Sequence, residues 1–241
     1  MEVPASNRFT PIVKGCFVFL ISMLLLGCAQ TAVKQRADYH ETRQSVSVLL
    51  MPVDIELSAL TAGGVSEVRA DWTETARSLV SEAVTRQLAQ HGDKLLPYEE
   101  PTDPAQFQQN TQLIKLHGLV GKTIFVYDLL PAATPPTRRG SFDWSLGSEV
   151  SRLREASGAD YGLFVYIRDS YATAGRKALI VTSALFGVGV TGGSQIGFCT
   201  LVDLRDGNIV WFNRIAKQTG DLRTLGAADV AVRELLAGIP L

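Results

Sequence analysis

Two apolar runs meet at a tight turn in the stretch Leu201-Val202-Asp203-Leu204-Arg205-Asp206-Gly207-Asn208-Ile209-Val210-Trp211. Asp206-Gly207 is a strong hairpin signal, because glycine accepts the positive φ that such a turn requires. We therefore expect two antiparallel strands, over residues 198–204 and 208–215. Another strand is expected upstream, over residues 161–169, where aromatic and branched apolar side chains dominate. The stretch makes a β-sheet the framework of this chain.

The sequence before this hairpin predicts strands that alternate with helices. The first strand is expected over residues 46–57, with Pro52 at a bulge or an unpaired position because proline has no N–H to donate. Asp71 and Glu74 resemble a capping box, which predicts a helix over residues 71–90. An edge strand is expected over 95–98, and further helices are expected from Asp103-Pro104 to about residue 127, over 148–156 and over 224–237. Together these elements predict the α/β class, with helices packed on a mixed β-sheet.

The amino-terminal segment over residues 1–27 has the layout of a secretory signal peptide. Arg8 and Lys14 provide a basic start, and an apolar run follows from Cys16 to Leu26. This run is shorter than the roughly 18 residues that identify a membrane-spanning helix, which argues against the alternative of an uncleaved anchor.

The segment ends in Leu25-Leu26-Gly27-Cys28, which resembles the lipobox of bacterial lipoproteins. In that family the signal peptide is removed before the cysteine, whose thiol carries a diacylglycerol and whose new amino group carries a fatty acid such as palmitate. The resemblance implies that Cys28 is the lipidation site. It also implies sorting to the outer membrane, because Ala29 stands where lipoproteins kept at the inner membrane have aspartate. Residues 28–45 are polar and lack a sustained period, which predicts a flexible tether to a single domain over residues 46–241.

Charge and cysteine content exclude several classes of protein. The net charge of −1 provides no basic face for nucleic acid. Of the three cysteines, Cys16 leaves with the signal peptide and Cys28 is lipidated, so Cys199 has no partner for an internal disulfide. Cys199 lies in a β-rich run, where we expect a small buried hydrophobic residue rather than a reactive or intermolecularly paired thiol.

A glycine-rich stretch precedes the hairpin strands. Gly187-Val188-Gly189-Val190-Thr191-Gly192 fits the pattern G-x-G-x-x-G of dinucleotide sites, but those sites need a helix directly after the glycines. A strand is expected there instead, so we expect a turn and no cofactor. The run over residues 178–190 has no charged residue. We expect ordinary core there, and the alternatives are a surface for a partner or insertion into lipid.

Catalytic and metal-binding patterns are missing from the sequence. His40, His91 and His117 share no metal-ligand spacing, and each is expected in a solvated or capping position. Asp169 and Asp203 are expected in surface ion pairs with neighbouring arginines. These observations favour a protein that has no metal or cofactor and is not an enzyme.

Three features together resemble envelope lipoproteins with the TolB amino-terminal-like fold. They are the strand and capped helix over 46–57 and 71–90, the strand in Gly158-Ala159-Asp160-Tyr161-Gly162-Leu163-Phe164-Val165, and the hairpin over 201–211. This family includes the curli secretion lipoprotein CsgG and accessory lipoproteins of polysaccharide export and of peptidoglycan synthase activation. The resemblance implies the fold and the compartment. The paired transmembrane hairpins of the curli pore have no counterpart in this sequence.

We therefore expect a lipid-anchored accessory lipoprotein of the outer membrane that faces the periplasm and binds other envelope components, in assembly, export or cell-wall machinery. Its expected partners are the membrane, through the lipid anchor, and envelope proteins or a second copy of the chain. The alternatives are a periplasmic hydrolase or ligand-binding protein, and an oligomeric secretion-pore component. Buried titratable residues that converge in a pocket would favour the hydrolase. An exposed apolar patch would favour the binding role.

Replacement of the lipobox cysteine, Cys28→Ser, tests the anchor. A hydroxyl cannot form the thioether, so this variant should accumulate as unprocessed precursor and take up no fatty-acid probe. The measurement is metabolic labelling with an alkyne fatty acid, and Cys199→Ala is the control that should keep full labelling. Processing and labelling that persist in Cys28→Ser would show that the lipoprotein assignment is wrong.

Overall fold

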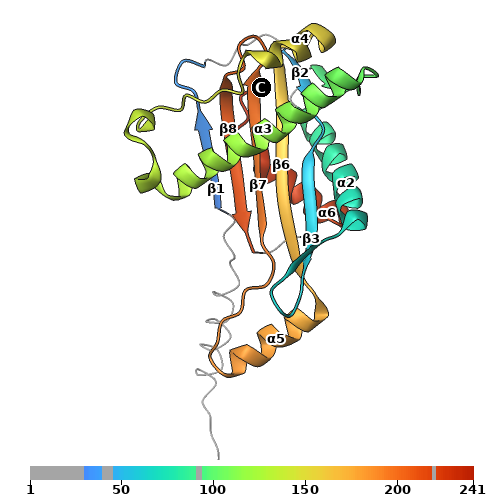
Figure 1. Ribbon diagram of the computed structural model, residues 1–241, viewed down its shortest axis with the longest axis vertical. Coiled ribbons are helices and arrows are strands. Elements are labelled where there is room, and N and C mark those ends of the chain that lie inside the picture. Colours follow the sequence, from blue (N-terminus) through green and yellow to red (C-terminus); the bar gives the residue numbers. More distant parts are fainter. Residues whose placement is uncertain (1–29, 40–45, 91–93, 219–220) are drawn as a thin grey trace, which may run out of the picture.

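Strand β6 (Tyr161–Ala172) lies at the centre of the sheet and pairs along both of its edges (Figure 1). The computed structural model describes residues 30–39, 46–90, 94–218 and 221–241. The first seven residues of β6 are all buried. A strand that is covered on both faces reads as a continuous apolar run, and this is what its sequence shows.

On one edge of β6, antiparallel strands continue the sheet. They are β7 (Gln195–Asp203), then β8 (Ile209–Lys217), and then β1 (Gln30–Gln35) at the outer edge. The predicted hairpin is confirmed, since Gly207 turns between β7 and β8 with a φ of +80°. A Cβ at this position would also lie 2.1 Å from the carbonyl oxygen of Gly147, so only glycine fits here.

On the other edge, two short strands pair with successive parts of β6. They are β2 (Ser47–Leu50) and β3 (Asp54–Leu60), which both run parallel to it. Leu50 is in register with Leu163 and Asp54 with Tyr166, so residues 51–53 bulge opposite only two residues of β6. The predicted single strand over 46–57 is therefore two strands, and the predicted bulge at Pro52 separates them. The outer strands are β5 (Lys94–Pro97), which pairs with β2 as the predicted edge strand, and β4 (Ser66–Val68), which pairs with β3.

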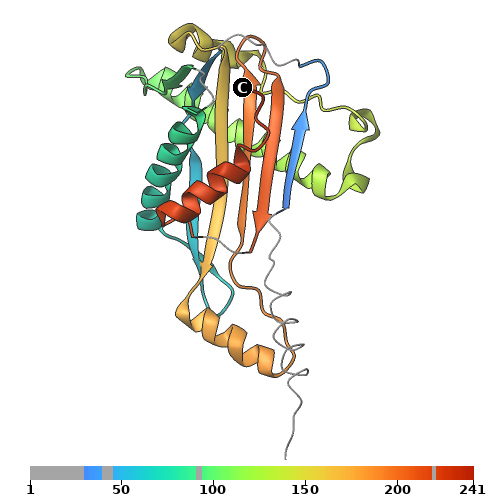
Figure 2. The same ribbon diagram turned by 180° about the vertical axis from the view of Figure 1, so that it is seen from behind.

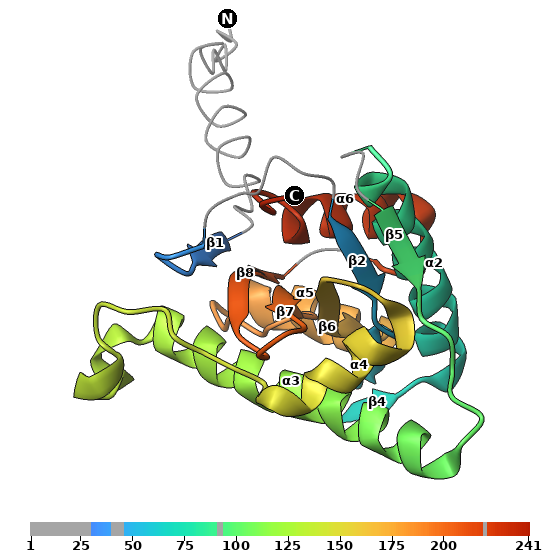
Figure 3. The ribbon, with the colours of Figure 1, turned by 90° about the horizontal axis from the view of Figure 1, so that it is seen from above.

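Helices cover both faces of the sheet, which gives three layers (Figure 3). One face carries α2 (Ala70–Leu88) and α6 (Leu225–Leu235), and the other carries α3 (Pro104–Leu129) and α4 (Ser151–Ser157) (Figures 1 and 2). Each face has its own apolar core. Short 3-10 turns lie at Pro131–Ala133, Pro136–Arg138 and Ser148–Val150, and helix α5 (Ala174–Leu185) lies outside both layers. The chain is thus an α/β protein with a mixed sheet and helices packed on it.

The two predicted helix starts have different outcomes. Asp103 caps α3 as predicted, since its carboxylate accepts the N–H of Ala105 at 3.0 Å. The capping box predicted for α2 is wrong, because Arg69 occupies the N-cap position and Asp71 lies inside the first turn. Asp71 pairs with Arg69 at 3.1 Å, and its charge still complements the positive end of the helix dipole.

The predicted tether over residues 28–45 is wrong for residues 30–35, which form β1. This strand gave no signal in the sequence, because an outer strand is held by backbone hydrogen bonds while its polar side chains stay in water. Residues 1–29 and 40–45, with the predicted signal peptide and Cys28, lie outside the described residues. Within the residues that are described, no helix is long and apolar enough to cross a membrane.

Helix α3 crosses the sheet at close range because it carries glycine where it meets aromatic rings. A Cβ on Gly118 would lie 3.4 Å from the ring of Tyr166, and a Cβ on Gly121 would lie 2.0 Å from a ring carbon of Phe198. Those two rings stack on each other, with centroids 4.6 Å apart. Gly121 therefore sets how closely α3 approaches the sheet.

The substitution Gly121→Ala should destabilise the fold by roughly 1–3 kcal/mol, because the added methyl group overpacks the ring of Phe198. Alanine favours a helix over glycine by up to about 1 kcal/mol, so the helical gain opposes the clash without removing it. Urea unfolding followed by tryptophan fluorescence measures the difference. Gly226→Ala in α6 is the control, since a Cβ there meets nothing within 4 Å and should be neutral or stabilising. Equal stability of the two variants would contradict the packing argument.

Candidate functional site

Helix α5 joins β6 to β7 and projects from one end of the sheet (Figures 1 and 2). None of its residues is buried, and neither is any residue of the loop that follows it, up to residue 194. The expectation of ordinary core over 178–190 is therefore wrong. We define the α5 surface as the exposed large apolar side chains of α5 and of the first residues after it, which are Leu179 (38% exposed), Val181 (65%), Leu185 (78%), Phe186 (82%) and Val188 (56%).

The glycine motif over 187–192 forms the loop between α5 and β7. Gly187 ends the helix with a φ of +72°, and the loop leads into Gln195, the first residue of β7. A dinucleotide site needs the N–H groups at the start of a helix, whereas a strand follows this motif. The expected turn is observed, and the geometry gives the dinucleotide interpretation no support.

The amino-terminal end of α5 is held on the sheet by side-chain hydrogen bonds. The hydroxyl of Thr173 accepts the N–H of Arg176 at 3.3 Å and donates to the carbonyl oxygen of Leu60 at 3.1 Å. Arg176 donates to the carbonyl oxygens of Thr191 at 3.0 Å and Ala62 at 3.3 Å. These bonds join α5 to the loops on both sides, so the α5 surface projects from a fixed base.

A buried hydrogen-bond network lies beneath this base. Oδ2 of Asp169 accepts the hydroxyl of Tyr171 and the Nε2 amide of Gln195, each at 2.5 Å, and the hydroxyl of Tyr171 accepts the N–H of Leu222 at 2.6 Å. Asp169 is only 4% exposed, and burial raises its pKa to about 6. The expected surface ion pair is therefore wrong for Asp169, whose carboxyl group joins β6 to β7 and to the segment before α6.

A depression of about 630 Å³ opens beside this network. Arg223 lies on its wall, paired with Asp221 at 2.6 Å and placed over the rings of Trp72 at 4.3 Å and Tyr171 at 4.5 Å. Asp169 can exchange a proton near neutral pH, but both of its donors bind the same oxygen and hold the carboxyl group inward. General acid–base hydrolysis uses a second positioned group. Asp221 also lines the depression and its charge raises the pKa of Asp169, but its carboxylate is held in the ion pair with Arg223. The network therefore joins β6, β7 and the segment before α6 at the end of the sheet from which α5 projects.

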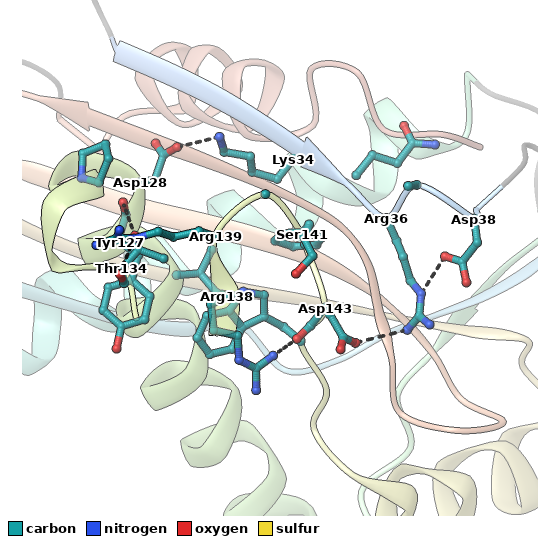
Figure 4. Close-up of a pocket in the computed structure, with 17 residues that line it drawn as sticks. Lys34, Arg36, Asp38, Tyr127, Asp128, Thr134, Arg138, Arg139, Ser141 and Asp143 are labelled. Carbon is teal, nitrogen blue, oxygen red and sulfur yellow. Dashed lines mark hydrogen bonds and ion pairs between the residues drawn. The ribbon is translucent and has the colours of Figure 1, made fainter. Parts of the chain in front are cut away.

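A larger cleft of about 890 Å³ lies between β1, the carboxyl-terminal end of α3 and the loop over 131–144 (Figure 4). Four basic side chains line it, but each already has a partner in the cleft. The pairs are Lys34 with Asp128 at 3.0 Å, Arg36 with Asp38 at 2.6 Å, Arg138 with the carbonyl oxygen of Asp143, and Arg139 with the carbonyl oxygen of Thr134 at 3.2 Å. Burial disfavours the charged form of Asp128, yet hydrogen bonds from Arg214 and Lys34 lower its pKa overall. The Lys34–Asp128 pair joins β1 to α3, and the bonds of Arg138 and Arg139 stay within the loop.

His117 is buried, so the expectation of a solvated or capping histidine is wrong for this residue. Its ring lies against Phe164 and Phe198, with centroids 5.1 and 5.3 Å away. Burial lowers its pKa to about 3, which keeps the imidazole neutral. His40 and His91 lie outside the described residues.

The remaining predicted residues lie close to where the sequence places them. Cys199 is fully buried, and burial raises the pKa of its thiol, so the prediction of a small hydrophobic residue is confirmed. Asp203 pairs with Arg205 at 2.5 Å as expected, although its own carboxylate is largely buried. Over the described ranges, no group of three or more His, Cys, Asp or Glu residues is placed to hold a metal ion.

The structure shows two features that the sequence did not directly predict, the exposed α5 surface and the Asp169 network, and the sequence contains a signal for the first. The uncharged run over residues 178–190 contains the α5 surface, and its composition allows insertion into lipid or contact with a partner as alternatives to core. The network of Asp169, Tyr171 and Gln195 had no such signal. Asp169 and Gln195 are far apart in the chain and meet only because β6 and β7 pair in this register.

Comparisons with known proteins identify no family. No protein-family model matches the chain, and no curated protein matches it. Among solved structures, the PelC dodecamer from Paraburkholderia phytofirmans in space group P6, and a point variant of that dodecamer in space group C2, each align with a TM-score of 0.39 and 11% identity. Both alignments cover 87% of this chain and 96% of the other. Similarity at this level carries no argument about fold or function.

The raised pKa of Asp169 predicts that its contribution to stability falls as pH rises. Between about pH 4 and pH 6 the folded chain keeps a proton on Asp169 that the unfolded chain has released, so deprotonation favours unfolding. The free energy of unfolding of the wild type, minus that of Asp169→Asn, should fall by about 2–3 kcal/mol from pH 4 to pH 7. Urea unfolding at a series of pH values measures this difference.

Asp221→Asn is the matched control, because hydrogen bonds from Arg223 lower the pKa of Asp221. The contribution of Asp221 to stability is present above its unfolded pKa and lost as pH falls. The free energy of unfolding of the wild type, minus that of Asp221→Asn, should therefore rise with pH. Taking differences also removes the effect of His117, whose lowered pKa acts over an overlapping pH range. If the difference between the wild type and Asp169→Asn in free energy of unfolding does not change with pH, the raised pKa of Asp169 is wrong.

Proposed function

We propose that the chain is a lipid-anchored lipoprotein of the outer membrane that faces the periplasm, binds another envelope component and performs no catalysis. The observation that supports this proposal is the α5 surface, an apolar surface presented to solvent on a helix that is packed against little else. The anchor in this proposal is Cys28, which the lipobox resemblance assigns.

The α5 surface is energetically unfavourable unless something covers it. An isolated helix of about twelve residues is marginal in water, and most helices gain their stability by packing an apolar face. α5 has twelve residues and none is buried. Full burial of one Leu or Phe side chain contributes about 1.5–3 kcal/mol, so covering Leu185 and Phe186 alone would stabilise a complex appreciably. Contiguous exposed apolar patches commonly mark interaction sites.

The polar groups favour binding over catalysis. Asp169 has the raised pKa of a candidate acid, but it is enclosed by its hydrogen-bond donors. In the large cleft of Figure 4, Lys34 and Arg36 are paired with carboxylates, and Arg138 and Arg139 donate to backbone carbonyl oxygens. A hydrolase needs two positioned groups that converge on a substrate. In the depression beside Asp169 the second carboxylate, Asp221, is occupied by its ion pair with Arg223. The α5 surface needs no such group, because apolar burial alone drives association.

A photo-crosslinking amino acid at Val181 should test the binding role in living cells. Val181 is 65% exposed on α5, so the probe does not disturb the core. Irradiation should yield an adduct with a lipid, an envelope protein or a second copy of the chain, detected as a mass shift. The control is the same probe at Ser148, which is exposed at the other end of the sheet and should react only with water. Equal absence of adducts at both positions would count against the proposal.

A further inference from the structure

We infer that the α5 surface lies in the same membrane leaflet that carries the lipid of Cys28, as a helix embedded in the interface between headgroups and acyl chains. This inference rests on the proposed function, since it takes the lipid anchor as given. It names the occupant of the α5 surface as lipid. A second copy of the chain or another protein are the competing occupants that the experiment must separate.

The described chain begins at the end of the sheet from which α5 projects (Figure 1). Gln30 is in register with Ala216, and Ala216 is in register with Ile196 near the start of β7. Neighbouring strands lie about 4.8 Å apart, so Gln30 lies roughly 10 Å across the sheet from the strand that follows α5. Cys28 precedes Gln30 by two residues, which reach at most about 7 Å. Ile196 is in register with Arg168, six residues before α5 begins at Ala174, so Gln30 lies about 20 Å along the sheet from the start of α5. A lipid on Cys28 would therefore lie at the same end of the sheet as α5.

The charge of this region fits a phospholipid surface. Residues 170–202 contain no Asp or Glu, and their only basic residues, Arg176 and Lys177, lie in the first turn of α5. Interfacial helices combine an apolar face with basic residues that are attracted to anionic headgroups. A specific protein interface normally carries a polar rim with hydrogen bonds, whereas the tip of α5 beyond Lys177 has no charged side chain.

The tip of α5 also satisfies its own backbone groups. The N–H of Gly187 donates to the carbonyl oxygen of Ala184 at 3.1 Å, and the N–H of Val188 donates to that of Ser183 at 3.0 Å. These two bonds make a Schellman motif, with Gly187 at positive φ. The hydroxyl of Thr182 donates to a carbonyl one turn earlier. Polar groups in an acyl environment need internal partners because water does not reach them, and this tip provides them.

The length of α5 favours an interfacial position over a spanning one. Twelve residues of helix extend about 18 Å, well short of the roughly 30 Å hydrocarbon core of a bilayer. The base of the helix is fixed by Arg176 and Thr173, so docking needs no rearrangement of the domain. The tip, with Leu185 and Phe186, is the part that enters the lipid.

Site-specific fluorescence on the lipidated full chain tests this inference. Leu185→Cys carries an environment-sensitive dye at the tip of α5, and Ser148→Cys carries it at the opposite end of the sheet as the matched control. Cys199 is fully buried and stays unlabelled. The protein is reconstituted in vesicles of phosphatidylethanolamine and phosphatidylglycerol that contain a spin-labelled lipid as quencher. The dye at 185 should be quenched at least about twofold and shifted to the blue, and the dye at 148 should show neither effect.

Each other outcome overturns the inference. If a water-borne quencher reaches the dye at 185 as well as the dye at 148, the α5 surface is exposed to solvent. If the dye at 185 is shielded from both the lipid quencher and the water-borne quencher, a second copy or another protein covers it. Mass spectrometry of the same preparation reports the diacylglyceryl group on Cys28. Its absence would refute the proposed anchor independently of the quenching result.

Discussion

Burial of β6 on both faces is the constraint on which the rest of the structure depends. Residues Tyr161–Ile167 are all buried, so helices must cover the sheet on each side of this strand. From Arg168 to Ala172 only Asp169 is buried, and the other four residues are partly exposed. Helix α5 follows directly and projects beyond the ends of α2 and α6 on one face and of α3 on the other (Figures 1 and 2). The exposure of α5 is therefore a consequence of the length of β6.

Burial shifts the pKa values of two ionisable side chains, with opposite consequences for the pH dependence of stability. Burial lowers the pKa of His117, so the unfolded chain binds its proton more readily and stability rises with pH above about 3. Burial raises the pKa of Asp169, so stability falls as pH rises towards about 6. The two effects overlap between these values and partly cancel. A nearly flat pH profile of the whole protein would therefore be consistent with two strongly perturbed groups.

Much of this fold is predictable from the sequence, and the exceptions share one physical cause. The Asp206-Gly207 turn, the cap at Asp103 and the bulge at Pro52 were predictable because each depends on local backbone chemistry. Strand β1, over residues 30–35, was not predictable because it has no sustained apolar pattern and its pairing is with a distant part of the chain. The Asp169 network depends on the same kind of long-range register. Features set by contacts between remote segments leave little trace in a single sequence.

A lipid-embedded α5 would affect the orientation of the domain more than its affinity for the membrane. Stable anchoring of a protein takes two lipid chains or a comparable second signal, and a lipoprotein anchor already supplies them. One flexible attachment point leaves the domain free to tilt and rotate about it. A second contact at the α5 tip, on the same end of the sheet as Gln30, removes much of that freedom. Gln35 pairs with Trp211 at the other end of β1, so the hairpin turn at Gly207 and the cleft in Figure 4 would then point away from the bilayer into the periplasm.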